Sequence, residues 1–423
     1  MNSVFKNFVY GLLISAVVHV LTPAPSSAES TSLKGDKSCA YGAGDCNRCV
    51  IDVQGKLKAL IDSYKDANRI RFSGYAYPTE KHLLNRIDAT KDEHVQSVGR
   101  IAGLGNNEYM VFTHSTASCQ SNKEGALAVV RMGAGQTSKG YELGAMPHDS
   151  GKDQTVSNRT VAKVSSGNNH PGGLSVLGHY VFVAQWCQPH PNGIEDNAAN
   201  LCSPGDHSSW CDVSSKEFHG DGFSVYDVSG VNDNTKIDSH PPIDKYYYHA
   251  YSDRWLDGKS TTGIASVKLD NGKYMVALSK SGGKEIGFYL ADSPFGPYSF
   301  KNSISVDLDG ENIHDGENST IITECNTGDL YMFHSEGYDA TAGKGTDKVH
   351  LYKLVQKNDQ IGLKFVSDKT FYCRGSDVDD AGDWCNFEAG VGTYVTPDGG
   401  LILYATDYHQ TSHGNIRLVE FTK

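Results

Sequence analysis

The sequence lacks several features that would assign it to a common class. No apolar run after residue 28 approaches the ~20 residues that a membrane span requires. Basic residues are in the minority, with 38 Lys and Arg against 50 Asp and Glu and a formal net charge of −12. This balance argues against a nucleic acid or an anionic membrane as partner, because both bind positive protein surfaces. A nucleophile-elbow Gly-x-Ser-x-Gly and a zinc-protease helix motif are also absent.

The first residues predict export. Lys6 supplies one positive charge, residues 8–21 are almost wholly apolar, and Ser26 and Ala28 place small residues at positions −3 and −1 of a cleavage site. This pattern is typical of a signal peptide over residues 1–28. The mature chain would have 423 − 28 = 395 residues and a net charge of −12 − 1 = −13, because Lys6 is removed. We expect a secreted protein, extracellular or periplasmic.

All ten cysteines follow the predicted cleavage site. An even number in an exported chain predicts disulfides, up to five of them. Spacing favours a bond between Cys373 and Cys385, and local pairing among Cys187, Cys202 and Cys211. Residues 46–49 have the Cys-x-x-Cys spacing of a redox motif, but no thioredoxin-like pattern surrounds them, and we expect a structural role.

Residues 263–289 contain the clearest structural pattern. Three short apolar segments are separated by turns at Asp270–Lys273 and Ser281–Lys284. Asp/Asn-Gly and Gly-Gly turns between such runs are typical of hairpins, because these residues accept positive φ at little cost. The segment therefore predicts a three-stranded antiparallel meander.

The same unit recurs along the chain. Five copies are recognisable, at residues 98–130, 173–228, 263–289, 319–354 and 392–421. Five sheets of about four strands predict an all-β fold, a five-bladed β-propeller over residues 68–423. A pair of β-sandwiches is the alternative. We expect a fourth strand outside each meander, for example at residues 298–304, and ring closure by pairing of residues 416–421 with residues 69–77.

The segment before the propeller, residues 29–67, predicts a leader and a helix. Residues 29–45 are polar and rich in glycine and serine, and we expect them to be loosely attached. Apolar residues then recur at helical spacing, which predicts one short amphipathic helix over residues 50–66 that braces one face of the domain.

Several stretches resemble a family of exported bacterial propeller-like proteins without a settled function. These stretches are residues 169–174 with 178–181, residues 263–289, and residues 387–390 with 403–406. The resemblance covers most of residues 93–423. It implies the propeller fold and secretion, and it brings no catalytic residues.

A second resemblance is to five-bladed propeller glycosidases of the arabinanase/xylosidase and invertase/levansucrase kind. Ala291–Tyr298 is similar to their Ser-Pro-x-Gly-Pro-aromatic segment, which is a turn before the outer strand and carries no chemistry. The Asn-Asp-Pro and Arg-Asp-Pro motifs of the invertases are absent. Glu324–Cys325 is similar to the acid motif of that family, and we interpret it as incidental.

The candidate site follows from the propeller geometry, because the polar residues just before each innermost strand should converge at one mouth of the central channel. Carboxylates there could act in pairs as acid, base or nucleophile in glycoside hydrolysis. Candidate catalytic residues are Glu93, Asp315, Glu317 and Glu388. Candidate ligand-binding residues are His94, Gln96, Asn169, His170, Thr262 and His314.

Three functions remain open. The preferred hypothesis is a binding module for a carbohydrate or another small polar ligand at the mouth. The alternatives are a glycoside hydrolase using two of the four carboxylates, and a scaffold for a protein partner with a merely solvated mouth. A metal ion held on the axis by His94 and His170 with Glu93 or Glu388 is a further hypothesis. Residues 227–234 and 307–312 are rich in oxygen ligands and could bind calcium, although such clusters are more often plain turns.

Overall fold

Alternating side chains explain why these segments form strands buried on both faces. In β13 (Tyr274–Lys280), Met275 and Ala277 pack toward one neighbouring sheet, while Tyr274, Val276 and Leu278 pack toward the other. Successive side chains of a strand point to opposite faces, so such a strand needs a sheet on each side. A ring of sheets supplies one without leaving an open end.

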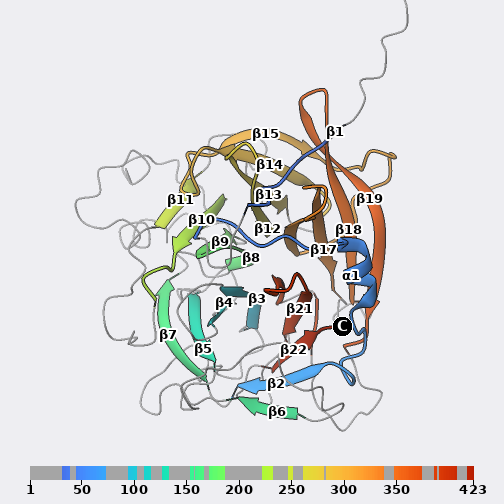
Figure 1. Ribbon diagram of the computed structural model, residues 1–423. Coiled ribbons are helices and arrows are strands. Elements are labelled where there is room, and N and C mark those ends of the chain that lie inside the picture. The colour runs from blue at the N-terminus through green and yellow to red at the C-terminus, as the bar shows by residue number, and fades with distance from the viewer. Residues whose placement is uncertain are drawn as a thin grey trace, which may run out of the picture.

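The computed structural model shows this ring, five sheets around a central axis (Figure 1). It describes residues 31–38, 44–72, 94–101, 109–115, 126–132, 153–156, 158–165, 171–185, 222–231, 246–250, 261–280, 283–337, 347–373, 385–387, 390–406 and 417–423. The prediction of an all-β, five-bladed propeller is confirmed.

Each blade is an antiparallel sheet numbered here from its innermost strand outward. Blade 1 contains β3 (His94–Ile101), β4 (Tyr109–Ser115), β5 (Ala126–Met132) and β7 (Asn158–Ser165), and blade 2 contains β8 (Pro171–Leu177), β9 (Tyr180–Gln185), β10 (Gly222–Asp227) and β11 (Tyr246–Ala250). Blade 3 contains β12 (Thr261–Lys268), β13, β14 (Ile286–Ala291) and β15 (Ser299–Ile304), and blade 4 contains β16 (Asn318–Thr323), β17 (Leu330–Glu336), β18 (Asp347–Lys357) and β19 (Gln360–Phe371). Blade 5 contains β20 (Val391–Val395), β21 (Leu401–Thr406), β22 (Arg417–Phe421), β2 (Asn68–Phe72) and β6 (Asp153–Val156).

The hydrophobic core is divided among the blade interfaces. Five clusters of buried residues each join two neighbouring blades, and together they cover every interface of the ring. Between blades 3 and 4, for example, Met275 and Phe288 pack against Met332 and Tyr352. Each interface depends on both partners, so the ring is stable only when it is closed.

Closure joins the two ends of the described chain. β2 pairs antiparallel with β22, with Asn68 opposite Glu420 and Arg71 opposite Arg417. The predicted pairing of residues 69–77 with residues 416–421 is therefore confirmed over its described part. The predicted outer strand of blade 3 is also present, as β15.

The segment before β2 is attached to the ring rather than loose. We call residues 31–67, without the undescribed 39–43, the N-terminal strap. β1 (Thr31–Ser32) pairs with β18, the Asp36 N–H donates to the Lys268 carbonyl at 2.9 Å, and Asn47 Oδ1 accepts from the Gly178 N–H at 2.9 Å. The strap thus contacts blades 4, 3 and 2 in turn, and Figure 1 shows it in blue crossing the ring. The expectation of a loosely attached leader was wrong, because its polar side chains and backbone bond to exposed turns.

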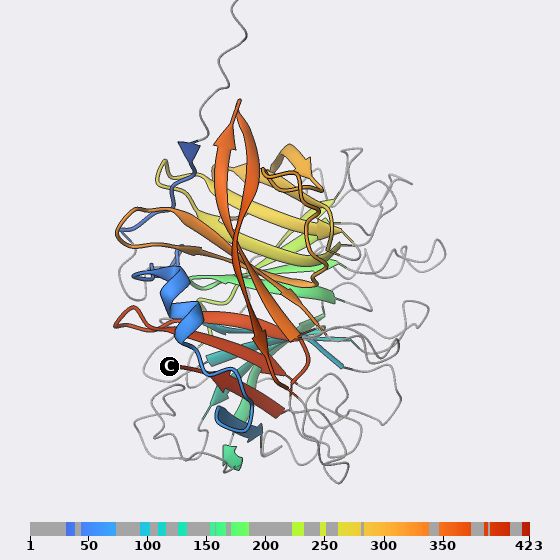
Figure 2. The ribbon, with the colours of Figure 1, turned by 90° about the vertical axis from the view of Figure 1, so that its right-hand side faces the viewer.

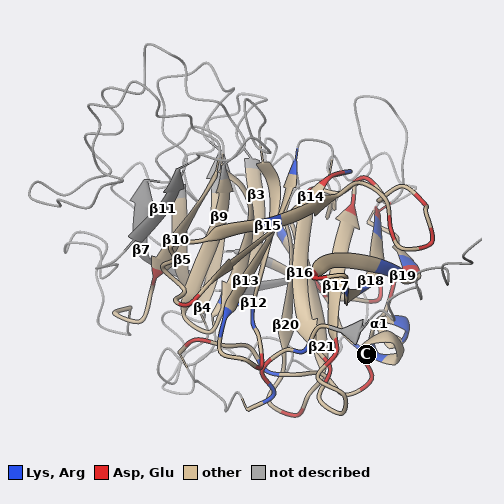
Figure 3. Ribbon diagram, turned by 90° about the horizontal axis from the view of Figure 1, so that it is seen from above, with Lys and Arg blue, Asp and Glu red and all other residues tan. Residues whose placement is uncertain are grey.

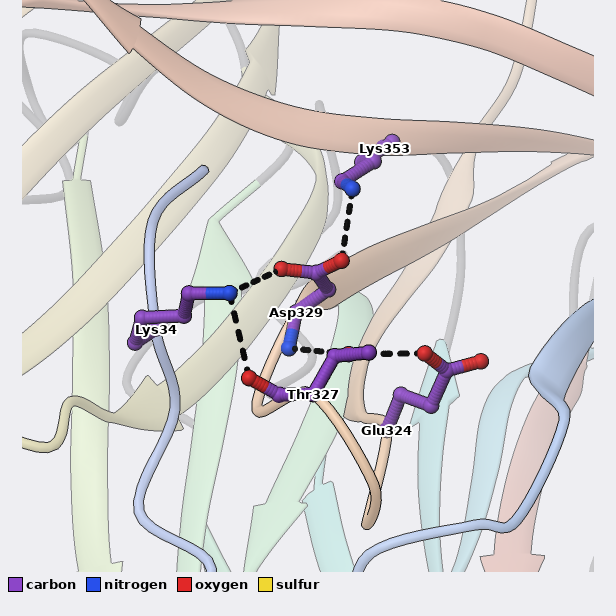
Figure 4. Close-up of polar contacts among 5 residues, drawn as sticks. All are labelled: Lys34, Glu324, Thr327, Asp329 and Lys353. Carbon is purple, nitrogen blue, oxygen red and sulfur yellow. Dashed lines mark hydrogen bonds and ion pairs between the residues drawn. The ribbon is translucent and has the colours of Figure 1, made fainter. Parts of the chain in front are cut away.

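Ion pairs hold the strap to blade 4 (Figure 4). Lys34 Nζ lies 2.5 Å from Asp329 Oδ1, and Lys353 Nζ lies 2.6 Å from Asp329 Oδ2. Burial alone would raise the pKa of the Asp329 carboxyl, but the hydrogen bonds from Lys34 and Lys353 outweigh it and lower the pKa to about 2. Thr327 orders the same turn by donating to Glu324 at 2.7 Å. Glu324 therefore belongs to a turn under the strap.

The predicted helix is much shorter than expected. α1 spans only Val53–Ala59, with Asp52 as its N-cap and an extended residue, Leu60, at its end. The chain leaves the helix because its next backbone groups pair with the propeller: the Ile61 N–H donates to the Thr422 carbonyl at 2.7 Å. The apolar spacing nevertheless predicted burial correctly. Val50, Val53, Leu57, Leu60 and Tyr64 all join the core between blades 4 and 5, and the helix braces that seam (Figure 2).

Two disulfides are described. Cys373 pairs with Cys385, as the spacing predicted, and Cys49 pairs with Cys325, which ties the strap to the turn after β16. Cys46 is disulfide-bonded as well, so the structural interpretation of residues 46–49 is confirmed. Cys187, Cys202 and Cys211 lie outside the described residues. Among the residues described, no helix has the length and hydrophobicity to cross a membrane.

The two disulfides should differ in their contribution to stability. The Cys49–Cys325 bond joins residues 276 apart, and the Cys373–Cys385 bond residues 12 apart. Loop-closure entropy in the unfolded chain grows with this separation, so Cys49→Ala/Cys325→Ala should lower the free energy of unfolding by about 4–5 kcal/mol and Cys373→Ala/Cys385→Ala by about 3 kcal/mol. Urea denaturation of both double variants measures this. Equal or reversed losses would contradict it.

The strap should weaken in acid. The folded-state pKa of Asp329 lies below its unfolded value of ~3.9, so the unfolded chain binds more protons between pH ~4 and ~2, and the stabilisation present above that range is lost as pH falls through it. Asp329→Asn should lower the free energy of unfolding by about 2 kcal/mol at pH 7, and the difference from wild type should shrink toward pH 2. The exposed Asp292, which pairs with Lys273, provides the control: Asp292→Asn should change stability by less than ~0.5 kcal/mol. A pH-independent effect of Asp329→Asn would contradict the account.

Candidate functional site

The two faces of the ring differ in what covers them. The strap lies against the turns where the innermost strands end, including Gly178, Leu269 and Gly328. The opposite face is where these strands begin, and their beginnings lie together: a Cβ on Gly263 would be 2.5 Å from the Glu317 carbonyl, and one on Gly390 would be 3.2 Å from Val95. We call this second face the mouth. Seen from the side, charged residues gather mostly in turns at the ends of the strands (Figure 3).

Backbone fills the axis just below the mouth. A Cβ on Gly173 would lie 3.1 Å from the Glu317 carbonyl and 3.2 Å from Gly263 Cα, so blades 2, 3 and 4 meet there without intervening side chains. Hydroxyl groups join the inner strands further along, and the Ser175 and Ser266 oxygens lie 2.9 Å apart. A ligand on the axis would therefore lie at the mouth and not deep within the ring.

Some predicted site residues are not available for description. Glu93, Asn169, His170 and Glu388 lie outside the described residues, and the structure describes only the backbone of His94, which begins β3. The axial metal site predicted from these residues stays a prediction.

Two other candidates are buried. Gln96 is 4% exposed, and Thr262, 1% exposed, donates its hydroxyl to the Lys280 carbonyl at 3.1 Å. The Thr262 hydroxyl is thus occupied within blade 3. A ligand at the mouth would meet it only after that bond breaks.

The three remaining candidates lie together on the connection from β15 to β16. His314 is exposed, while Asp315 and Glu317 are partly exposed. Asp315 Oδ2 lies 3.3 Å from Lys284 Nζ, which projects from the β13–β14 turn of the neighbouring blade. Charged groups of both signs thus meet where blades 3 and 4 join.

A buried histidine holds this junction together. His334 Nε2 lies 3.2 Å from the carbonyls of both Gly283 and His314, and its Nδ1 lies 2.8 Å from Ser319 Oγ. Carbonyls only accept, so Nε2 carries the proton and Nδ1 accepts from the serine hydroxyl. Burial is the main cause that lowers the pKa of His334 to about 4, and the ring stays neutral at pH 7. It fixes the turn that carries Lys284 relative to the connection that carries Asp315.

Sequence reasoning missed two polar residues beside His314. The His314 ring stacks on that of His350, with centroids 3.9 Å apart and an interplanar angle of 4°, and His350 Nε2 lies 2.8 Å from Glu336 Oε2. The search of the sequence covered only residues before the innermost strands. Glu336 ends the second strand of its blade and His350 lies near the start of the third, so the polar residues at those strand ends were the available signal.

Electrostatics at this cluster follow from its contacts. Burial, and then the neighbouring His350, lower the pKa of His314. The hydrogen bond from His350 is the first cause that lowers the pKa of Glu336. A neutral imidazole is therefore favoured at His314, and an ionised carboxylate at Glu336.

The loops considered for calcium use their carboxylates as turn caps. Asp307 Oδ1 accepts from the N–H groups of Asp309 at 2.9 Å and Glu311 at 3.0 Å, and Asp227 Oδ1 accepts from the Ser229 N–H at 2.9 Å. These bonds fit the turn alternative. Calcium binding stays a prediction. Glu324 lies on the strap face, away from the mouth, which fits its interpretation as incidental.

No protein-family model and no curated protein matches the sequence. Solved structures with a similar fold include a family 117 glycoside hydrolase from Zobellia galactanivorans, with 10% identity over 85% of this chain and 92% of that chain and a TM-score of 0.40. An α-L-arabinanase from Penicillium chrysogenum has 10% identity over 78% and 93% and a TM-score of 0.37. A GDP-Man-dependent mannosyltransferase from Leishmania mexicana has 10% identity over 85% and 91% and a TM-score of 0.33. The function of this chain must be argued from its own site.

The junction of blades 3 and 4 requires glycine at position 283. Its φ is +67°, and a Cβ there would lie 1.9 Å from the Gly316 carbonyl oxygen, whereas Gly272 has a φ of +82° and nothing within 4 Å of an added Cβ. Gly272→Ala should lower the free energy of unfolding by about 1–2 kcal/mol through backbone strain alone. Gly283→Ala should lower it by at least about 2 kcal/mol more, because the connection carrying Asp315 must also move. Thermal denaturation of the pair tests this, and equal losses would count against the described packing.

Proposed function

We propose that this protein is exported and binds a carbohydrate or another small polar ligand at the mouth of the propeller. The observation that supports this most is the pairing of Asp315 with Lys284 at the junction of blades 3 and 4. Both side chains are about half exposed, and neighbouring backbone packing fixes their positions. A carboxylate accepts hydrogen bonds from sugar hydroxyls, and an ammonium group donates them.

The asymmetry of the ring supports the same location. The strap occupies the face where the innermost strands end, and backbone fills the axis below the mouth. Described polar groups that a ligand can reach are thereby concentrated on one face. Small-ligand sites in proteins generally combine a few such groups on a rigid scaffold.

Hydrolysis is the second candidate, because Asp315 and Glu317 bring two carboxyl groups to the same connection. A retaining glycosidase needs two carboxyl groups ~5–5.5 Å apart and an inverting one needs ~6.5–9.5 Å, in both cases flanking the bond that breaks. The axis packed by Gly173 and Gly263 leaves no deep pocket between the described blades. We therefore favour binding over catalysis.

Binding and hydrolysis are separated by one panel of polysaccharides and oligosaccharides. We expect the thermal unfolding temperature to rise with one class of sugar while no reducing ends are released. Asp315→Asn should weaken that binding at least tenfold, because it removes the charge that pairs with Lys284. Calorimetric titration with the responding sugar measures the change.

The matched control is Asp292→Asn. Asp292 is an exposed carboxylate paired with Lys273 at 2.6 Å, beyond the end of β14 on the strap side of blade 3, and its loss should leave binding unchanged. Release of reducing ends that disappears in Asp315→Asn would replace the binding proposal with hydrolysis. No response to any sugar, or equal losses in the two variants, would remove the proposal and favour a protein partner.

A further inference from the structure

Three side chains with metal-ligating atoms lie together in blade 4, near the mouth. His314 comes from the connection between β15 and β16, Glu336 ends β17, and His350 lies in β18. One ligand atom from each lies within 4.8 Å of the others. Pairing of β17 with β18 and the return of the connection over their ends bring these separate segments together. The cluster is thus a product of the fold and not of a local sequence motif.

The most buried member of the cluster has an unused ligand atom. The His350 side chain is 1% exposed, and its Nε2 lies 2.8 Å from Glu336 Oε2. Its Nδ1 has no hydrogen-bond partner among the residues that the structure describes. Buried polar atoms nearly always have a partner, so this imidazole has binding capacity that the described protein atoms do not satisfy.

We propose that His314, Glu336 and His350 bind a transition metal ion of the Zn²⁺ class. Two imidazole nitrogens and one carboxylate suit Zn²⁺, Co²⁺ or Ni²⁺, whereas Ca²⁺ and Mg²⁺ prefer oxygen ligands alone. Three protein ligands leave a fourth position for water or for a bound molecule. The site is distinct from the axial one predicted at His94 and His170, and it does not depend on the proposed carbohydrate function.

The surroundings hold the site while leaving one ligand able to adjust. The backbone of His314 is anchored on both sides: its N–H donates to the Tyr352 hydroxyl at 3.2 Å, and its carbonyl accepts from His334 Nε2 at 3.2 Å. Its ring is exposed, so it can turn out of the stack and direct a nitrogen toward His350 and Glu336. The Phe365 ring, with its centroid 5.9 Å from that of His314, forms an apolar wall.

The protonation states favour metal binding near pH 7. Metal ions bind the neutral imidazole and the ionised carboxylate, and protons compete for the same atoms. The pKa values of both His314 and Glu336 lie below their ordinary range in the folded protein. The ion would therefore displace few protons.

Zinc titration of untagged protein, stripped with EDTA and dialysed, tests the site without any sugar present. We expect one equivalent of Zn²⁺ by isothermal calorimetry, a higher thermal unfolding temperature, and visible absorption of four-coordinate Co²⁺ on substitution. His314→Ala and Glu336→Gln should each weaken the affinity for Zn²⁺ at least tenfold. Both residues are partly or fully exposed, and far-ultraviolet circular dichroism of the stripped proteins checks that the fold is kept.

The control is His179→Ala. His179 Nε2 lies 3.6 Å from Asp227 Oδ1, so it forms a histidine–carboxylate pair without a second imidazole, on the strap face. Its removal should leave zinc affinity unchanged. Absence of uptake by the wild type would leave a plain hydrogen bond between His350 and Glu336 and overturn the proposal. Uptake of equal affinity in all the variants would overturn it as well, by placing the metal elsewhere.

Discussion

Ring closure is the constraint on which the structure depends. Every blade buries both of its faces against neighbours, so the interface between blades 5 and 1 exists only if the chain returns to its starting point. Pairing of β2 with β22 makes that return within blade 5, and the strap, its ion pairs at Asp329 and the Cys49–Cys325 bond hold the segment leading into it. A chain that must close in this way couples its N-terminal segment to the stability of the whole ring.

The same segment gives the ring two unlike faces. Ridges of turns on one face pair with the strap, while the other face keeps the ends where innermost strands begin. Close glycine contacts at positions 173, 263 and 283 bring the backbones of blades 2, 3 and 4 together there and hold Lys284, Asp315 and His314 in fixed relation. The chemistry that we propose, sugar binding beside a metal site in blade 4, uses that rigidity.

Much of this fold could be predicted from the sequence, because strand alternation and Gly turns are local signals. The meander at residues 263–289 and the closing strand at 416–421 are examples. The helix at residues 50–66 was overestimated, since apolar spacing reports burial but not which backbone groups find partners outside the helix. The cluster of His314, Glu336 and His350 was only partly found, because cross-strand register decides which polar strand ends meet. The attachment of the strap likewise depends on contacts between residues hundreds of positions apart.

The claim that ligands bind at the mouth and not on the strap face is tested most directly by amide hydrogen exchange with and without a bound oligosaccharide. We predict slower exchange in peptides containing residues 283–286 and 314–318, where blades 3 and 4 join at the mouth. Peptides containing residues 269–273 and 324–329, under the strap, should exchange at unchanged rates. Protection confined to the strap side would contradict the account.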